Sequence, residues 1–426
     1  MAKPNLALIP ATIGNKVYSI LPNDGVGDFD FTRGTVATRI NAQGLIEQVA
    51  SGENRLNYSL LDGEVVGCPH LLLENSATNL LQYSEQLSNW TNIQNVTVSD
   101  NDIISPDGTQ NASKVNETTS NSVHRLFLNP TVTSAKHTYS VFLKKGTRSW
   151  AYLRLDGAQS EQRTWFDLEN GVLGTVNSDH IASIENFGNG WYRCSVSIAG
   201  TTYDTTPLAI LALSTENNVF SYAGGTDKYI YAWGAMLEEG SYPTSYIKTT
   251  SAAVTRAAET CNGSGNAATF NDSEGVLMAE ISALADDGTN RRISISNGST
   301  SDRVVLGYTG ASNQLIVLVS SNSVSGVASL VNIDNSLQFN KIALKYKLND
   351  FALWINGIEI LTDNSLNSPI GLNDLSFEGA DNLNDFYGNT KQIQYFDSVL
   401  DSEQLEQLTS WDSFRAMAEG QLYSIE

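Results

Sequence analysis

The chain has 426 residues, enough for two or three domains with cores of their own. Charged residues make up only 17% of it, and Asn, Ser, Thr and Gly supply the remaining polarity. With 25 basic and 46 acidic residues the net charge is −21. Such a chain repels nucleic-acid backbones and anionic membrane surfaces, so we expect no nucleic-acid partner and no membrane insertion.

The cysteines and the first residues indicate where the chain folds. Cys68, Cys194 and Cys261 are odd in number and far apart, which does not suit a disulfide framework. Residues 1–25 lack the charged and apolar regions of a signal peptide, and no apolar run reaches the roughly 18 residues that span a bilayer. We therefore expect synthesis in a reducing cytoplasm.

Residues 1–70 predict an irregular N-terminal arm. Pro4, Pro10 and Pro22 interrupt it, and only short alternating runs follow. The segment is too small for a convincing domain, so we expect it to dock on another part of the molecule.

Residues 71–250 predict a jelly roll, because segments of alternating polarity recur between turn signals. In the segment 137–146, Tyr139, Val141 and Leu143 share one face. The segments 149–156 and 162–168 alternate in the same way, and Asn170-Gly171 ends the second with a turn.

The rest of the chain predicts a linker, a second sandwich and a helix. Residues 251–270 are rich in small residues. Residues 271–400 hold seven further strand candidates, of which the last is 391–397 and two are joined by a turn at 348–350. In the tail, 401–426, Asp401 or Ser402 can cap a helix that Gly420 ends. Its apolar side is Leu405, Leu408, Trp411 and Phe414. The predicted fold is all-β: two tandem β-sandwich (jelly-roll) domains with an N-terminal irregular arm and a short C-terminal helix.

Three segments resemble phage structural proteins. LLLENSATNLLQYSEQLSNW (71–90) is similar to the segment that opens a carbohydrate-binding-module-like jelly roll in those proteins, and residues 229–259 resemble its end. Residues 28–49 are similar to the leader that often accompanies it. Farther on, residues 340–360 and 392–408 resemble the late strands and helix of a concanavalin A-like, laminin-G-type domain.

These resemblances imply a virion surface protein, such as a head fibre, a decoration protein or a tail-associated component, made in the cytoplasm of a bacterial host. The implied partners are other capsid or tail proteins and a host-surface polysaccharide. By analogy with phage fibres, a homo-oligomer is expected, commonly a trimer.

The candidate ligand site is the polar and aromatic face of one predicted hairpin. If the segments 149–156 and 162–168 pair, their alternate side chains project from the same side. Sugars suit such a face, because their C–H surfaces stack on aromatic rings and their hydroxyls need charged or amide partners. The alternative is that these side chains pack against the leader, the second domain or another subunit. The predicted carbohydrate-binding residues are Trp150, Tyr152, Arg154, Arg163, Trp165 and Asp167.

Other aromatic residues favour packing. Trp191 and Trp233 lie in strands whose pattern is that of a core. Loops at 100–108, 223–227 and 381–389 are rich in Asp, Asn and Gly, whose oxygens suit Ca²⁺. Turn chemistry explains the same residues, so no metal ligand is predicted, and no other cofactor is expected.

Catalysis is not expected. The chain has no zinc-protease, nucleophile-elbow, redox CxxC or P-loop motif, and its four histidines are dispersed. The alternative is a polysaccharide depolymerase or glycoside hydrolase of lectin-like fold, which needs two carboxylates on either side of the scissile bond.

Overall fold

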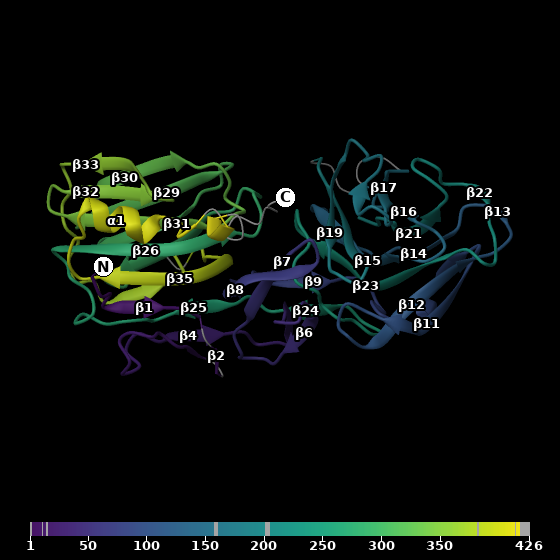
Figure 1. The fold of residues 1–426 in the computed structure, drawn as a ribbon, viewed down its shortest axis with the longest axis horizontal. Coiled ribbons are helices and arrows are strands. Elements are labelled where there is room, and N and C mark those ends of the chain that lie inside the picture. The colour runs from purple at the N-terminus through teal and green to yellow at the C-terminus, as the bar shows by residue number, and fades with distance from the viewer. Residues whose placement is uncertain are drawn as a thin grey trace.

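Two β-sandwiches lie side by side along the long axis of the molecule (Figure 1). The computed structural model describes residues 2–10, 12–13, 16–156, 161–200, 205–380, 383–413 and 415–417. Nearly all regular structure in these residues is β-strand, with one short α-helix near the C-terminal end. The predicted all-β class, with two sandwiches and a C-terminal helix, is confirmed.

The first sandwich has two six-stranded sheets around one core. Tyr139, Val141 and Leu143 point into that core, as their alternation predicted. One sheet has the order β11 (Val96–Ile104), β12 (Gln110–Glu117), β23 (Tyr229–Glu239), β15 (His137–Lys145), β20 (Trp191–Ile198) and β19 (His180–Asn186). The other has the order β10 (Asn92–Gln94), β14 (Arg125–Leu128), β21 (Ala209–Ser214), β16 (Trp150–Arg154), β17 (Arg163–Asp167) and β18 (Val172–Leu173). A small pair, β13 (Asn121–Ser122) and β22 (Tyr222–Ala223), and the 3₁₀ turn η1 (Leu87–Asn89) complete it.

The second sandwich packs a large sheet on a five-stranded one. The large sheet runs β33 (Ile358–Asp363), β32 (Phe351–Ile355), β31 (Asn340–Lys347), β26 (Glu274–Ala283), β35 (Gly388–Phe396), β8 (Glu64–Leu73) and β7 (Leu56–Leu61), and β1 (Leu6–Leu8) also pairs with β35. The smaller sheet runs β30 (Val324–Asn332), β29 (Gln314–Ser321), β28 (Arg303–Tyr308), β27 (Arg291–Ser296) and β34 (Asp374–Ser376). The β31–β32 hairpin turns at 348–350, as predicted.

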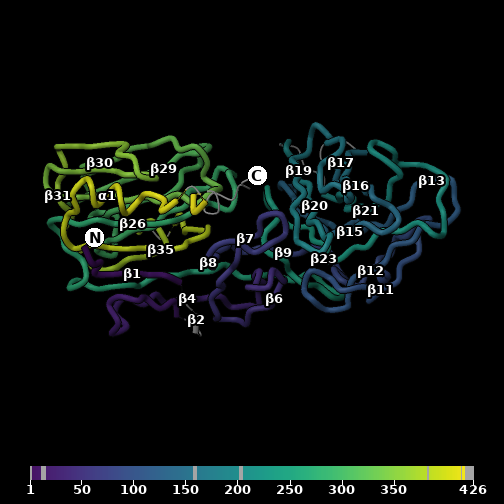
Figure 2. The backbone as a smooth tube through the Cα atoms, in the orientation of Figure 1, coloured from purple at the N-terminus to yellow at the C-terminus, as the bar shows by residue number. Residues whose placement is uncertain are grey.

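The arm belongs to both sandwiches rather than standing apart from them. Its strands β1, β7 and β8 extend the large sheet of the second sandwich, so the N-terminus lies beside the C-terminal half of the chain (Figure 2). The hairpin of β5 (Ala37–Ile40) and β6 (Ile46–Val49) covers the first sandwich, where Ile46 packs with Trp233. The arm packs on both sandwiches, and on the second it does so by strand pairing that continues to Leu73.

The prediction of a linker at 251–270 is wrong for two short segments, which form β-strands. β24 (Val254–Arg256) pairs with β9 (Ala77–Asn79). β25 (Thr260–Asn262) joins the small sheet of β2 (Thr12–Ile13), β3 (Lys16–Val17) and β4 (Phe29–Thr32). Strand pairing satisfies the backbone of this crossing, and Cys261 is fully buried.

Helix α1 (Ser402–Thr409) is shorter than predicted. Asp401 caps the helix in a capping box with Gln404, and the helix ends at Ser410, whose backbone is extended. Leu405 and Leu408 are buried with Trp354 of the large sheet. Trp411 lies beyond the helix, while Phe414 and Gly420 fall outside the described residues.

A buried ion network joins the arm, the first sandwich and the crossing strands. Arg33 donates to Glu259 at 2.7 Å, and Arg55 contacts both Glu259 and Glu74, the latter at 2.7 Å. Arg256 reaches Glu74 at 3.1 Å. All five side chains are essentially inaccessible to solvent. Burial alone would raise the pKa of Glu74, but Arg256 and Arg55 outweigh it and lower that pKa to about 2.

Replacing one carboxylate of this network should destabilise the fold strongly. Glu259→Gln leaves Arg33 and Arg55 short of a counter-charge in a dry site, and we expect a loss of about 3–5 kcal/mol in unfolding free energy. Glu47→Gln is the matched control, because it breaks the part-exposed Arg39–Glu47 pair, worth about 1 kcal/mol or less. Urea denaturation of both variants measures the difference, and equal losses would contradict the role of the network.

Candidate ligand pocket between the sandwiches

The predicted hairpin of 149–156 and 162–168 is present as β16 and β17. Trp150 lies opposite Asp167, Tyr152 opposite Trp165, and Arg154 opposite Arg163. Directly opposite residues point to the same side of a sheet, so the six candidate residues share one face, as predicted. The rings of Tyr152 and Trp165 contact each other with centroids 5.5 Å apart.

Most of this face is buried under its own domain. The indole N–H of Trp165 donates to the carbonyl of Val219 at 3.2 Å, and Phe220 lies 4.4 Å from the Arg163 guanidinium. Tyr152, Arg154, Trp165 and Asp167 are buried, whereas Trp150 and Arg163 are partly exposed.

The charged members of the face also have partners of their own. Arg154 pairs with Asp156 at 2.5 Å, and Asp167 accepts from Asn170 at 2.8 Å in the turn that follows β17. The segment that covers this face comes some fifty residues later in the chain, so the alternation of β16 and β17 gave no sign of it. The glycan-binding role of this face stays a prediction, with Trp150 and Arg163 the members within reach of a ligand.

Trp191 and Trp233 pack as their pattern predicted. Both are buried on the outer side of the first sandwich, beneath the β5–β6 hairpin and against Phe142 and Tyr246. Their aromatic faces are occupied by protein, so they offer no platform to a ligand.

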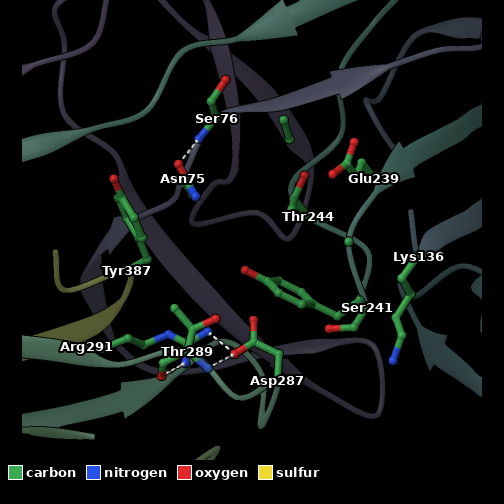
Figure 3. Close-up of a pocket in the computed structure, with 13 residues that line it drawn as sticks. Asn75, Ser76, Lys136, Glu239, Ser241, Thr244, Asp287, Thr289, Arg291 and Tyr387 are labelled. Atoms are coloured by element: carbon green, nitrogen blue, oxygen red, sulfur yellow. Dashed lines mark hydrogen bonds and ion pairs between the residues drawn. The ribbon is translucent and has the colours of Figure 1, made fainter. Parts of the chain in front are cut away.

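A pocket of about 350 Å³ lies where the two sandwiches meet (Figure 3). The first sandwich and its following loop supply Lys136, Glu239 and Tyr242, and the second supplies Arg291 and Tyr387. Tyr242 lines this pocket, and Figure 3 shows Arg291 and Asp287 on one side of it and Glu239 on the other. Burial raises the pKa of Tyr242, so its hydroxyl stays protonated at neutral pH.

The charges of this pocket divide into paired and unpaired groups. Arg291 donates to Asp287 at 2.9 Å and to the carbonyl of Thr289 at 3.0 Å, while its Nε has no partner. Within the described part of the chain, the Lys136 ammonium forms no ion pair and the Tyr242 hydroxyl no hydrogen bond. The pocket therefore offers aromatic surface together with free donors.

The loop 240–246 separates this pocket from a second, larger cleft. Thr244 lines both cavities. The Thr244 amide and hydroxyl donate to the buried Glu238 carboxylate at 2.9 and 2.6 Å. The next residue, Ser245, donates to Glu74 at 2.6 Å, which ties the loop to the ion network.

Sequence reasoning missed this pocket because its residues come from distant segments. Asn75, Tyr242 and Arg291 approach one another only through tertiary packing. One signal was visible in the sequence: Gly240, Ser241 and Pro243 break the pattern directly after a long strand, as functional loops often do.

The described residues hold no group of three or more His, Cys, Asp or Glu side chains placed to bind a metal ion. In the loop 100–108, Asp107 accepts from Ser105 and Thr109 in the manner of a turn. In the loop 381–389, which is also rich in Asp, Asn and Gly, residues 381–382 lie outside the described residues. Among the helices described, none is long and apolar enough to cross a bilayer.

No family model and no curated protein matches this chain. Among solved structures, the CBM40 module of a Ruminococcus gnavus IT-sialidase bound to α2,3-sialyllactose is 17% identical, with 33% of this chain and 84% of that one covered at a TM-score of 0.28.

Two further structures are similar at the same level. Domain 4 of AbnA, a GH43 arabinanase from Geobacillus stearothermophilus, in complex with arabinotriose, is 12% identical, with 40% and 83% covered at a TM-score of 0.29. Domains LG4-5 of the mouse laminin α1 chain are 9% identical, with 66% of this chain and 89% of that one covered at a TM-score of 0.24. The similar structures are thus carbohydrate-binding-module, laminin-G and lectin-like domains.

Glu238 should make the fold less stable as the pH rises. Burial raises its pKa to about 7, from an ordinary 4.5. A carboxyl group whose pKa is raised on folding stabilises the fold fully below pH 4.5, and that contribution is lost as the pH rises through 7.

Glu238→Gln removes this titration. Relative to the variant, we expect the wild type to lose roughly 3 kcal/mol of unfolding free energy between pH 4.5 and 8, at about 1.4 kcal/mol per pKa unit. Urea midpoints measured at half-unit pH steps test this. Parallel pH profiles for the two proteins would contradict it.

Proposed function

We propose that this chain is a non-catalytic glycan-binding protein of the virion surface, and that a saccharide binds between Tyr242 and Tyr387. The observation that carries the proposal is the pocket built jointly by the two sandwiches. Its volume of about 350 Å³ falls in the range of small-ligand sites. A sugar ring would stack on the tyrosines, and its hydroxyls would accept from Tyr242 and Lys136.

The carboxylates of the pocket support binding rather than catalysis. Asp287 is held by Arg291, and Glu239 accepts from the Thr133 hydroxyl at 2.9 Å. Glycoside hydrolysis needs one carboxyl group kept protonated and a second free to act as base or nucleophile. Asp287 and Glu239 each already have a partner of their own, so neither is left free for these roles.

The virion location rests on the resemblance of residues 28–49, 71–90 and 229–259 to phage structural proteins. These segments meet at the ion network, through Arg33, Glu74 and Glu259. Shared use of this buried arrangement gives a physical reason for a similarity spread over three distant segments.

Removing the pocket tyrosine should weaken glycan binding. We expect Tyr242→Ala to weaken binding to the best ligand of a glycan array by at least about tenfold, because stacking and a hydroxyl donor are both lost. Trp150→Ala is the matched control, since Trp150 is the most accessible ring of the hairpin face predicted from sequence. Loss of binding in Trp150→Ala alone would place the ligand on the hairpin instead.

The chain should also be a stoichiometric component of particles. Mass spectrometry of gradient-purified virions from the source phage is expected to detect it in a fixed ratio to the major capsid or tail protein. Its absence from intact particles would contradict the virion location and leave the glycan pocket to be judged separately.

A further inference from the structure

We propose that Arg193, in the wall of the larger cleft beside loop 240–246, binds the carboxylate of an acidic saccharide. The cleft measures about 750 Å³ and is distinct from the pocket around Tyr242. Its anion-binding character goes beyond the proposed function, whereas the choice of a saccharide as ligand rests on it.

The cleft lies between the arm and the first sandwich. The β7–β8 hairpin contributes Tyr58, strand β20 contributes Tyr192 and Arg193, and the turn after β19 contributes Phe187. At one point the two walls touch through their turns. A Cβ on Gly188 would lie 2.7 Å from the carbonyl oxygen of Gly63, and both glycines have positive φ, so only glycine fits this contact.

Arg193 is buried, yet its guanidinium has only neutral partners. Nη2 donates to the Thr244 carbonyl at 2.7 Å and to the Ser140 hydroxyl at 3.2 Å, and Nε has no partner. The guanidinium lies 5.4 Å from the Phe142 ring. No described carboxylate forms an ion pair with it.

Every other buried arginine of the described chain has a carboxylate partner within 4 Å. These residues are Arg33, Arg55, Arg154, Arg256 and Arg291. Because an unpaired buried charge is costly, the fold elsewhere supplies a counter-charge each time. Arg193 has no such counter-charge from the described chain, and it is the buried arginine that lines the larger cleft.

The neighbouring carboxylates do not take this role. Glu185 lies directly opposite Arg193 on β19, but it is exposed and forms no ion pair with it. Glu238 interacts electrostatically with Arg193, but both of its carboxylate oxygens accept hydrogen bonds from Thr244. The guanidinium is therefore left to an outside anion.

The aromatic side chains of the cleft suit the sugar ring that carries the carboxylate, although Asp62, Glu74 and Glu185 also line the cleft and confine the anion to Arg193. Guanidinium groups bind carboxylates through short charge-assisted hydrogen bonds. At Arg193 the available donor is Nη1, because Nη2 is engaged by Thr244 and Ser140 and Nε is buried from solvent. Tyr58, Phe187 and Tyr192 supply aromatic surface for the ring that carries the acid. The volume of the cleft is enough for more than one sugar unit.

Calorimetric titration of the full chain with D-glucuronate, D-glucose and acetate tests the proposal. We expect glucuronate to bind more tightly than the other two, and Arg193→Met to weaken it by at least about tenfold, as the loss of a charge-assisted pair predicts. Arg39→Met is the control, because Arg39 lines the same cleft but pairs with Glu47 at 3.0 Å, and it should change the affinity less than threefold.

Each contrary outcome overturns one part of the Arg193 proposal. No glucuronate binding, or equal affinity in the wild type and Arg193→Met, would overturn the site. Glucose binding as tightly as glucuronate would overturn the anion role, and acetate doing so would overturn the saccharide. The glycan-array result for Tyr242→Ala tests the other pocket, so failure of that pocket is seen separately from failure of the Arg193 site.

Thermal unfolding separates a ligand-binding arginine from a structural one. Methionine replaces an unpaired buried charge by an apolar side chain of similar length, so the midpoint of Arg193→Met should equal or exceed that of the wild type. Arg55→Met, which strips two buried glutamates of their partner, should lower it markedly. A fall in Arg193→Met as large as that of Arg55→Met would overturn the proposal.

Discussion

Five buried charges hold this fold together. Arg33, Arg55 and Arg256 share Glu74 and Glu259 in a site that water does not reach. Such a network is stable only when every member is paired, because a single separated charge keeps its desolvation cost without its attraction. Its members come from the arm, the start of the first sandwich and the crossing strands. If one of these segments unfolds by itself, buried charges on the others therefore lose their partners.

The network also explains how the cavities are placed. Glu74 holds Ser245, and the adjoining Thr244 is held by Glu238, so the loop between the two cavities is fixed at both residues. Arg291 and Tyr387, which also line the Tyr242 pocket, are not part of this network.

Sequence patterns predicted the features that depend on neighbouring residues. Alternation gave the β16–β17 register, and Asp401 gave the start of the helix. Patterns could not predict that β8 would pair with β35, more than three hundred residues later, because period-two alternation describes one strand and not its partner. The same limit explains why the hairpin face was expected to be open and the pocket at Tyr242 was not foreseen.

Differential scanning calorimetry tests most directly whether the ion network makes the two sandwiches one cooperative unit. If it does, the chain should unfold in a single transition whose calorimetric and van't Hoff enthalpies agree. The reason is that Arg55 and Glu74 flank strands β7 and β8 of the second sandwich and pair with Glu259 and Arg256 of the crossing segment. Two separate transitions in the wild type would contradict this, since each sandwich would then be stable without the shared network.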